Sequence, residues 1–338
     1  MMVKMYIKIL CAIIVLSSVI STTYVYAQPL SLSREEIIQY TPFWEGERFP
    51  DGRPKVPDSV IERLKYVTIT EAWGFLQRPD SNAPGMRGSG YINQYVGTLE
   101  KMHDDVTICG RAMTAHFMPY RPDTNSAISE QGAKDGRGRG QYTWGIDQLQ
   151  TGDVYVVNVC EAILDASHVG DNLGTSIWTK SGNGAIIYGT LRDLEGNQNI
   201  EGFNIFVRDF RPQANSNNMM IGLNCPIQIG YVTVMPGDIV LAKRLGVVFI
   251  PPHYAETLVS NSERTRLRDK FAHAGVREGR FTARQADGAY TPEMNAEFNQ
   301  WLKNNKNNMG KFFDDPNAAP SVEVIEAYIK EREEGNAR

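Results

Sequence analysis

Residues 170–196 read "GDNLGTSIWTKSGNGAIIYGTLRDLEG", and this stretch decides the fold. A turn ending at Gly170 precedes a predicted helix over 171–181, and the apolar run "GAIIYGTL" is typical of a buried strand. The apolar run "GDVYVVNVCEAIL" at 152–164 predicts another buried strand before the turn. This order predicts a parallel βαβ unit, with Arg192 and Asp193 at the carboxyl end of its second strand.

The start of the predicted helix is a candidate anion site. The N–H groups of a first helical turn have no partner within the helix, and the helix dipole adds positive charge there. Gly170 and Gly174 keep side chains away, so that a ligand can approach the backbone closely. We therefore expect the turn of Gly170, Asp171, Asn172 and Leu173 to receive a small anion such as a carboxylate.

Three charged side chains near this turn suit chemistry through an enolate. Arg192 can grip a carboxylate or an enolate with two parallel hydrogen bonds. Asp193 is a hard oxygen ligand of the kind that Mg²⁺ accepts singly while it keeps most of its waters. Asp171 could take a proton directly or through water. A divalent cation would act as a Lewis acid for the developing enolate oxygen.

Simpler roles exist for the same residues. An Asp at a helix start is usually a cap worth ~1 kcal/mol. An Arg-Asp pair at a strand end is usually a surface ion pair worth ~0–1 kcal/mol. Residue types and spacing alone therefore indicate an anion or metal site and leave these alternatives open.

The surrounding chain extends the βαβ unit into an α/β core over residues 106–255. Strands are expected at 106–119 and 203–209, and the segment 226–252 predicts short strands broken by Gly and Pro-Gly-Asp turns. A core of this length has the size of an ordinary domain.

Both flanks of the core are predicted to be additions. Residues 28–105 read as an extended arm followed by helices that Asp58 and Thr70 would cap. Residues 256–338 are helical in pattern, most clearly in "TPEMNAEFNQWLKNN" and "SVEVIEAYIKEREEG".

The motif and its neighbours resemble the RraA-like family. The resemblance rests on "VGDNLGTSIWTKSGNGAIIYGTLRDLEG", on "GFNIFVRDFRP" and "CPIQIGYVTVMPGDIVLAKRLGVVFIPP", and on the preceding "GRAMTAHFMP". This family includes the class II 4-hydroxy-4-methyl-2-oxoglutarate and 4-carboxy-4-hydroxy-2-oxoadipate aldolases and the regulator of ribonuclease activity A. The resemblance implies a swivelling β/β/α fold, and homotrimers or homohexamers with active sites between subunits.

The resemblance also implies roles for the site residues. The turn and the arginine would hold pyruvate, Arg192 would clamp the enolate, and Asp193 would carry Mg²⁺ or Mn²⁺ through a largely hydrated shell. Asp171 becomes the candidate acid and base. The substrate-binding set is then Gly170, Asp171, Asn172, Leu173 and Arg192.

The sequence departs from the family pattern in one place near the site. Many members have a glycine-rich segment after the second strand, where this chain has "NVCEAILDAS", so that the rim of the pocket differs. Aldolases of the family also recruit an acidic residue from a neighbouring subunit, and no residue of this chain is assigned to that role.

The first 27 residues are predicted to be a secretory signal peptide. Lys4 and Lys8 precede an apolar run that ends at Ile20, and "VYA" is a small-residue cleavage site before Gln28. An uncleaved membrane anchor is the alternative. We expect a periplasmic or secreted protein that has no membrane contact after cleavage.

The charge argues against a nucleic-acid partner. The formal charge is −4, and it becomes −6 when Lys4 and Lys8 leave with the leader, while no basic block supplies a footprint for phosphates. An exported protein would also have no access to a cytoplasmic ribonuclease.

These observations predict a metal-dependent carbon–carbon lyase acting on a 2-oxo or hydroxy acid. The reaction would be retro-aldol cleavage that releases pyruvate, decarboxylation of oxaloacetate, or both, through an enolate. Two alternatives are an exported carboxylate-binding or assembly module without chemistry, and a lyase or epimerase for a sugar-derived acid.

Overall fold

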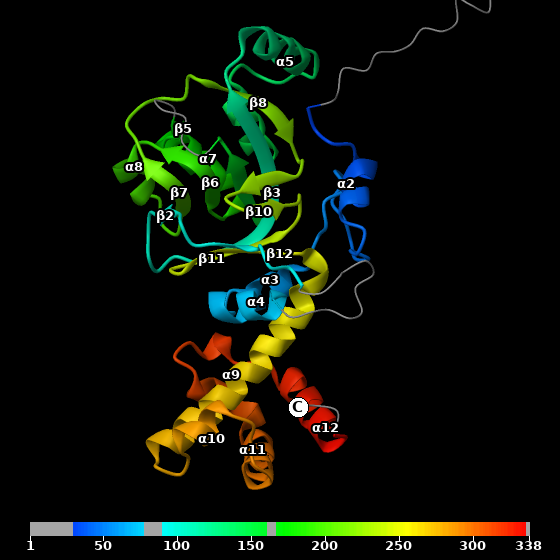
Figure 1. Ribbon diagram of the computed structural model, residues 1–338, viewed down its shortest axis with the longest axis vertical. Helices are drawn as coiled ribbons and strands as arrows, with labels where there is room; N and C mark the ends of the chain where they lie inside the picture. Colours follow the sequence, from blue (N-terminus) through cyan, green and yellow to red (C-terminus); the bar gives the residue numbers. More distant parts are fainter. Residues whose placement is uncertain (1–29, 78–89, 161–166, 336–338) are drawn as a thin grey trace, which may run out of the picture. The chain divides into compact units, whose positions relative to one another are not determined.

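Four parallel strands form the centre of the sheet. The computed structural model describes residues 30–77, 90–160 and 167–335, and in it these strands lie in the order β3, β4, β6, β7 (Figure 1). β4 and β6 are parallel neighbours, and α7 lies between them in the chain, so the predicted βαβ unit is confirmed. The bounds are β3 Ile108–Pro119, β4 Asp153–Asn158, α7 Asp171–Ser181, β6 Ala185–Leu191 and β7 Ile205–Phe210.

The strand predicted over 152–164 is shorter than expected. β4 ends at Asn158, and Cys160 has a left-handed backbone with φ of 52°, which an extended strand cannot continue. The remainder of the predicted strand, residues 161–164, lies outside the described residues. β5, Ser167–Val169, then runs parallel to β6 and leads directly into the turn at Gly170.

Antiparallel strands complete the sheet on both sides of the parallel centre. β11, β12 and β1 follow one another beyond β3, while β2 pairs with β7 at the opposite edge and β8 pairs with β3. A separate hairpin consists of β9 and β10. The bounds are β1 Tyr95–Val96, β2 Glu100–Lys101, β8 Asn218–Leu223, β9 Ile227–Ile229, β10 Val232–Val234, β11 Ile239–Lys243 and β12 Gly246–Ile250.

Alternate residues of β11 pack into two different cores. Ile239 and Leu241 belong to a cluster with residues of α3, α4 and α9, whereas Val240 and Ala242 belong to a cluster with the β9–β10 hairpin. Successive side chains of a strand point to opposite faces, so a strand covered on both faces must be apolar throughout. The continuous apolar run in this part of the sequence has this origin.

Two helices that precede the sheet differ from the prediction in how they begin. Asp58 is the first residue of α3 rather than its cap, because its carboxylate accepts a hydrogen bond from Arg111 of β3. α4 is capped by Thr68 rather than by Thr70, through reciprocal bonds between Thr68 and Glu71. The helices are α2 Arg34–Tyr40, α3 Asp58–Leu64 and α4 Ile69–Leu76.

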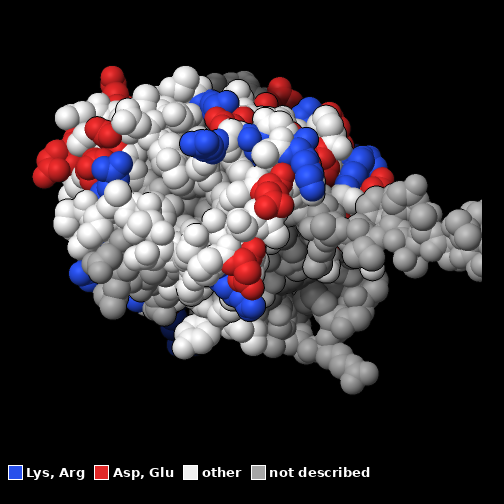
Figure 2. All heavy atoms as spheres, turned by 90° about the horizontal axis from the view of Figure 1, so that it is seen from above, with Lys and Arg blue, Asp and Glu red and all other residues white. Residues whose placement is uncertain are grey.

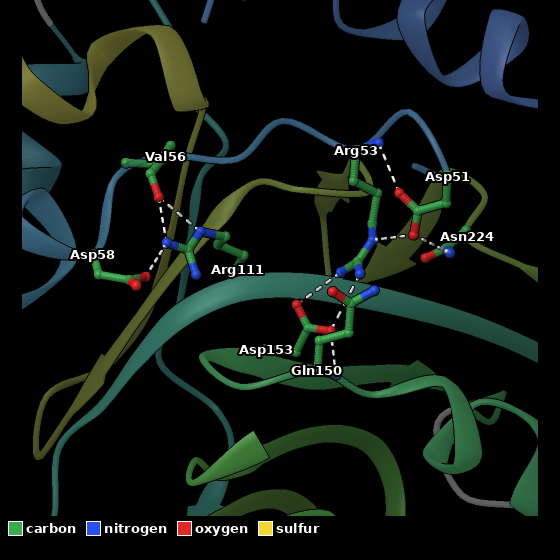
Figure 3. Close-up of polar contacts among 8 residues, drawn as sticks. All are labelled: Asp51, Arg53, Val56, Asp58, Arg111, Gln150, Asp153 and Asn224. Atoms are coloured by element: carbon green, nitrogen blue, oxygen red, sulfur yellow. Dashed lines mark hydrogen bonds and ion pairs between the residues drawn. The ribbon is translucent and has the colours of Figure 1, made fainter. Parts of the chain in front are cut away.

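Buried arginines tie the N-terminal arm to the sheet (Figure 3). Arg53 donates to both carboxylate oxygens of Asp153 on β4, at 2.9 and 3.2 Å, and its Nε donates to Asp51 at 2.8 Å. Arg111 donates to the Val56 carbonyl and to Asp58. The arm is therefore anchored by charged hydrogen bonds and not by apolar contacts alone.

The C-terminal residues form helices with a core of their own. α9 leads from β12 past α3 and α4, and α10, α11 and α12 pack around its second half (Figure 1). The predicted helices at 291–305 and 321–335 are confirmed as α11 and α12. The helices here and in the core are α5 Pro122–Lys134, α6 Gln141–Trp144, α8 Leu194–Gln198, α9 Ala255–Arg277, α10 Ala283–Asp287, α11 Pro292–Asn305 and α12 Val322–Glu333, with short 3₁₀ turns at Ile146–Gln148, Pro252–Tyr254, Lys306–Phe312 and Pro316–Ala318.

From Ser31 onward, the described residues form one compact unit. The predicted signal peptide, residues 1–27, lies outside the described residues. Among the residues that are described, no helix combines the length and the apolar character needed to cross a membrane.

Candidate functional site

The start of α7 is built by backbone rather than by a side-chain cap. Gly170 is the N-cap residue, and the ladder of helical hydrogen bonds begins with the Gly174 N–H donating to the Gly170 carbonyl at 2.9 Å. The Asp171 carboxylate does not cap the helix from the N-cap position; it accepts from the adjacent Asn172 N–H at 2.8 Å. Asn172 is exposed and Leu173 is half-buried on this first turn.

Arg192 and Asp193 follow directly after β6. The Arg192 N–H donates to the Val169 carbonyl at 3.0 Å, which ties the end of β6 to the strand that leads into the Gly170 turn. The Arg192 guanidinium and the Asp193 carboxylate form an ion pair at 2.8 Å, and both side chains are a little over one-third exposed. Solvent and ligands can therefore reach both charges.

Asp193 has an unusual backbone. Its φ of 55° and ψ of 48° lie in the left-handed region, and it precedes α8 without using its carboxylate as a helix cap. Asp tolerates this region better than most residues because its short polar side chain can bond locally. The conformation turns the chain sharply between β6 and α8, and it leaves the carboxylate available to Arg192 or to a ligand.

The turn and the Arg-Asp pair are in contact. A Cβ placed on Gly170 would lie 2.5 Å from the Asp193 Oδ2 and 3.0 Å from the Arg192 Cζ. A Cβ on Gly196 of α8 would lie 2.6 Å from the Asp171 Oδ2. The structure thus brings Gly170, Asp171, Arg192 and Asp193 together at the carboxyl edge of the parallel strands. Their roles as substrate and metal ligands stay predictions.

Asn197 is a site residue that sequence reasoning missed. It is fully buried, and its Nδ2 donates to the carbonyls of Arg192 at 3.1 Å and Asp193 at 3.0 Å. Gly174 of α7 leaves the space that the Asn197 side chain occupies. Asn197 therefore holds the sharp turn that presents the Arg-Asp pair, and only the packing of α8 on α7 reveals this.

Replacing Asn197 with leucine should destabilise the protein by about 1–3 kcal/mol, because two carbonyls lose their donor in a buried turn. Urea denaturation measures the loss as a lower midpoint. Asn199 lies exposed at the end of the same helix, so Asn199→Leu is the matched control and should stay within about 0.5 kcal/mol of wild type. Equal midpoints for Asn197→Leu and wild type would contradict the assignment.

His168 lies two residues before the turn and is structural. It is buried against the Phe117 ring, and its Nε2 lies 3.3 Å from the Tyr155 hydroxyl. Burial lowers the pKa of His168 to about 3, so the ring is neutral near pH 7. It supports the strand entering the turn and does not act as an acid or base there.

The lowered pKa of His168 predicts a loss of stability in acid. Because the unfolded chain binds the proton below its ordinary pKa of about 6.5 and the folded chain does not, stability falls as the pH falls. The difference in unfolding free energy between wild type and His168→Asn should shrink by about 2 kcal/mol from pH 6.5 to 4.5. Denaturation at several pH values measures it. Parallel curves would contradict a neutral, buried His168, since groups common to both proteins cancel.

The site fits a largely hydrated divalent cation. Mg²⁺ is commonly held by one or two carboxylates and keeps several waters, which suits the half-exposed Asp193. Within the described ranges no group of three or more His, Cys, Asp or Glu side chains could form a closed metal site. Figure 2 shows one face of the molecule, on which acidic and basic side chains are interspersed rather than gathered into a basic field.

Fold and site together define an α/β protein in which a helix-start turn faces an Arg-Asp pair at the edge of a mixed sheet. The chain belongs to the RraA-like family: residues 75–249, more than half of its length, match this family, which is described as Aldolase/RraA. The predicted family is confirmed. The match begins before the core predicted at 106–255, and it includes the edge strands β1 and β2; the predicted domain boundaries stay a prediction.

Solved structures share the fold. Streptomyces coelicolor RraAS2, an unusual member of the RNase ES inhibitor RraA protein family, has 22% identity and a TM-score of 0.52 over 65% of this chain and 99% of its own. An uncharacterized Pseudomonas syringae pv. tomato protein has 18% identity and a TM-score of 0.54 over 72% of this chain and 99% of its own. At these identities the likeness establishes the α/β RraA-like fold, as predicted, and no activity.

A relative by sequence is Protein DlpA of Legionella pneumophila, 26% identical over 162 residues. The matched region is 48% of this chain but only a quarter of the length of DlpA. The family includes aldolases, which can depend on a divalent metal, and RNase inhibitors without catalytic activity. Membership of this family therefore does not determine whether the protein is an enzyme or which reaction it catalyses.

Proposed function

We propose that this protein is a metal-dependent carbon–carbon lyase that acts on a 2-oxo or hydroxy acid. The reaction is retro-aldol cleavage releasing pyruvate, or decarboxylation of oxaloacetate, and both pass through the pyruvate enolate. The observation that carries the proposal is the direct contact between the Gly170 turn and the Arg192-Asp193 pair. A cationic side chain, the backbone amides at the start of α7 and a hard carboxylate then lie next to one another.

The charged residues divide the work. Arg192 binds the substrate carboxylate and the developing enolate with parallel hydrogen bonds, and the first-turn amides of α7 bind the remaining oxygens. Asp193 would hold Mg²⁺ or Mn²⁺, which supplies Lewis-acid stabilisation of negative charge on oxygen. Asp171 accepts the proton of the substrate hydroxyl group, whose C–O bond becomes a carbonyl as the carbon–carbon bond breaks and its electron pair forms the pyruvate enolate.

The ion pair between Arg192 and Asp193 couples the binding of substrate to the binding of the cation. Each charge neutralises the other at 2.8 Å before a ligand arrives. A substrate carboxylate competes for the guanidinium, which releases the Asp193 oxygen for a cation. Substrate and cation should therefore bind cooperatively. The substrate carboxylate takes the place of Asp193 beside Arg192, and the cation takes the place of Arg192 beside Asp193.

Pyruvate release with Mg²⁺ or Mn²⁺ tests the proposal, with 4-hydroxy-4-methyl-2-oxoglutarate and oxaloacetate as substrates. Arg192→Ala and Asp193→Ala should each lower kcat/KM by about 100-fold or more, as loss of a charge that stabilises the transition state does. Arg211, directly after β7, forms a similar half-exposed pair with Asp209 of that strand, so Arg211→Ala is the matched control and should keep activity.

Unchanged turnover in both site variants would refute the lyase. Tight binding of pyruvate or oxalate without any turnover would instead assign the alternative, a carboxylate-binding module. Turnover of oxidised sugars alone would assign a sugar-acid lyase or epimerase.

We also propose that the leader directs export and that the mature protein assembles as a homotrimer or homohexamer, in which a neighbouring subunit completes the site. Mass spectrometry of the secreted chain should find Gln28 at its N-terminus. Light scattering should give three or six times the monomer mass.

A further inference from the structure

A cavity lies away from the Gly170 turn. It has a volume of about 270 Å³, and none of the residues that line it belongs to the candidate site. The lining residues come from the end of α2 and the arm that follows it, from the segment before β1, from β10 and the turn before β11, and from the residues after β12. The lining residues are Tyr40, Thr41, Pro42, Phe43, Trp44, Tyr91, Gln94, Thr233, Met235, Asp238, Pro251, Pro252 and His253.

Aromatic rings make up much of this lining. Phe43 and His253 meet edge to face with centroids 5.5 Å apart, and Tyr91 lies 6.1 Å from the same His253 ring. The Trp44 indole N–H donates to the Glu47 carbonyl at 2.8 Å. Its polar atom is therefore satisfied outside the cavity, and its ring contributes apolar surface.

One carboxylate residue, Asp238, is among the lining residues. Asp238 is only 4% exposed, and its Oδ2 accepts the Met235 N–H at 2.8 Å. Burial raises the pKa of Asp238 to about 7, because the ionised form loses its hydration. A cation close to this carboxylate would favour its ionised form.

Among the described residues that line the cavity, there is no lysine or arginine. The nearby Arg48 lies behind Thr41 and donates to the Thr41, Trp44 and Gly52 carbonyls. Its charge is thus directed toward the arm backbone. The described lining thus combines aromatic surface with one buried carboxylate.

We propose that this cavity binds a small organic cation with a methylated ammonium head. A cation over aromatic faces is attracted by their negative quadrupoles, and cages of this type recognise quaternary ammonium groups. A primary ammonium would need several hydrogen-bond acceptors, which a largely apolar lining does not favour. The volume is just below the roughly 300–1,000 Å³ of sites for drug-sized ligands, so it suits a small metabolite.

Calorimetric titration with choline and with 3,3-dimethyl-1-butanol tests the proposal. The two probes have the same shape, but the second lacks the charge. At pH 8.5, where Asp238 is ionised, choline should bind at least tenfold more tightly than the neutral alcohol. Equal affinities for the two probes would show that the cavity binds apolar groups without regard to charge, which would overturn the proposal. No heat of binding with 50 mM choline would also overturn it.

Variants separate the two parts of the proposed cage. Phe43→Leu changes a side chain that is 40% exposed and should weaken choline binding about tenfold, which is the upper range of one cation–π contact. Asp238→Asn should have a similar or larger effect. Tyr231→Leu, at a ring that is 92% exposed and outside the cavity, is the control.

If Asp238→Asn does not fold by circular dichroism, Phe43→Leu alone decides. Choline affinity unchanged in Phe43→Leu would overturn the cation–π assignment. The described lining of this cavity contains no residue of the Gly170 turn. The outcome of the choline experiments is therefore independent of the outcome of the lyase experiments.

Discussion

Asp153→Ala is expected to destabilise the protein by about 3–5 kcal/mol. Asp153 is fully buried, and it accepts two hydrogen bonds from Arg53 and one from the Gln150 N–H (Figure 3). Arg53 is itself 1% exposed, so alanine at 153 leaves the buried guanidinium with the partly exposed Asp51 as its remaining carboxylate partner. Urea denaturation should show a much lower midpoint, together with release of the N-terminal arm in hydrogen exchange.

Two further variants define what Asp153→Ala measures. Arg53→Met/Asp153→Leu removes both charges and should recover most of the loss, since paired apolar residues often replace a buried ion pair without cost. Arg121→Ala removes an exposed partner of Asp123 and should cost less than about 1 kcal/mol. If the double variant is as unstable as Asp153→Ala, the instability does not come from the buried charge of Arg53 after it loses Asp153.

Gly170→Ala should lower kcat/KM for pyruvate release by about 100-fold, the effect of a misplacement of about 1 Å at a catalytic centre. The new Cβ would lie 2.5 Å from the Asp193 Oδ2 and 3.0 Å from the Arg192 Cζ, so the ion pair must move away from the turn. The backbone of Gly170 itself, with φ of −114°, is accessible to alanine. A loss of activity in Gly170→Ala would therefore come from the contact between the new Cβ and the Arg192-Asp193 pair, and not from backbone strain.

Gly74→Ala provides the control for a glycine replaced by alanine. Gly74 lies in α4 with no heavy atom within 4 Å of its added Cβ, so this variant should keep activity and gain up to about 1 kcal/mol of stability. Full activity of Gly170→Ala, measured with saturating Mg²⁺ or Mn²⁺, would contradict the placement of the site. Steady-state kinetics of both variants make the comparison.

Local patterns predicted the centre of the fold well. The βαβ unit, α7, β6, α11 and α12 follow from hydrophobic periodicity over neighbouring residues, and they lie where the pattern places them. The cap of α4 was also readable, because Glu71 follows Thr68 by three residues as a capping box requires. The prediction that Thr70 caps this helix is wrong, because the capping box consists of Thr68 and Glu71.

Other features could not be predicted because they depend on partners far away in the chain. Arg53 and Asp153 are 100 residues apart, and nothing near either residue announces the pair. From the local sequence Asp58 is expected to be a helix cap, but its carboxylate accepts a hydrogen bond from Arg111 on β3. The cavity around Asp238 likewise joins residues from the arm and from both sides of β11 and β12.

By itself the sequence determined the βαβ unit, the glycine turn and the Arg192-Asp193 pair, because hydrophobic period and turn chemistry act over a few neighbouring residues. Tertiary structure alone decided that the Gly170 turn touches this pair, that Asn197 holds the turn from within α8, and that an arm arginine is buried in the sheet. The reason is physical: contacts between packed elements depend on which faces meet, and that is a property of the assembled core.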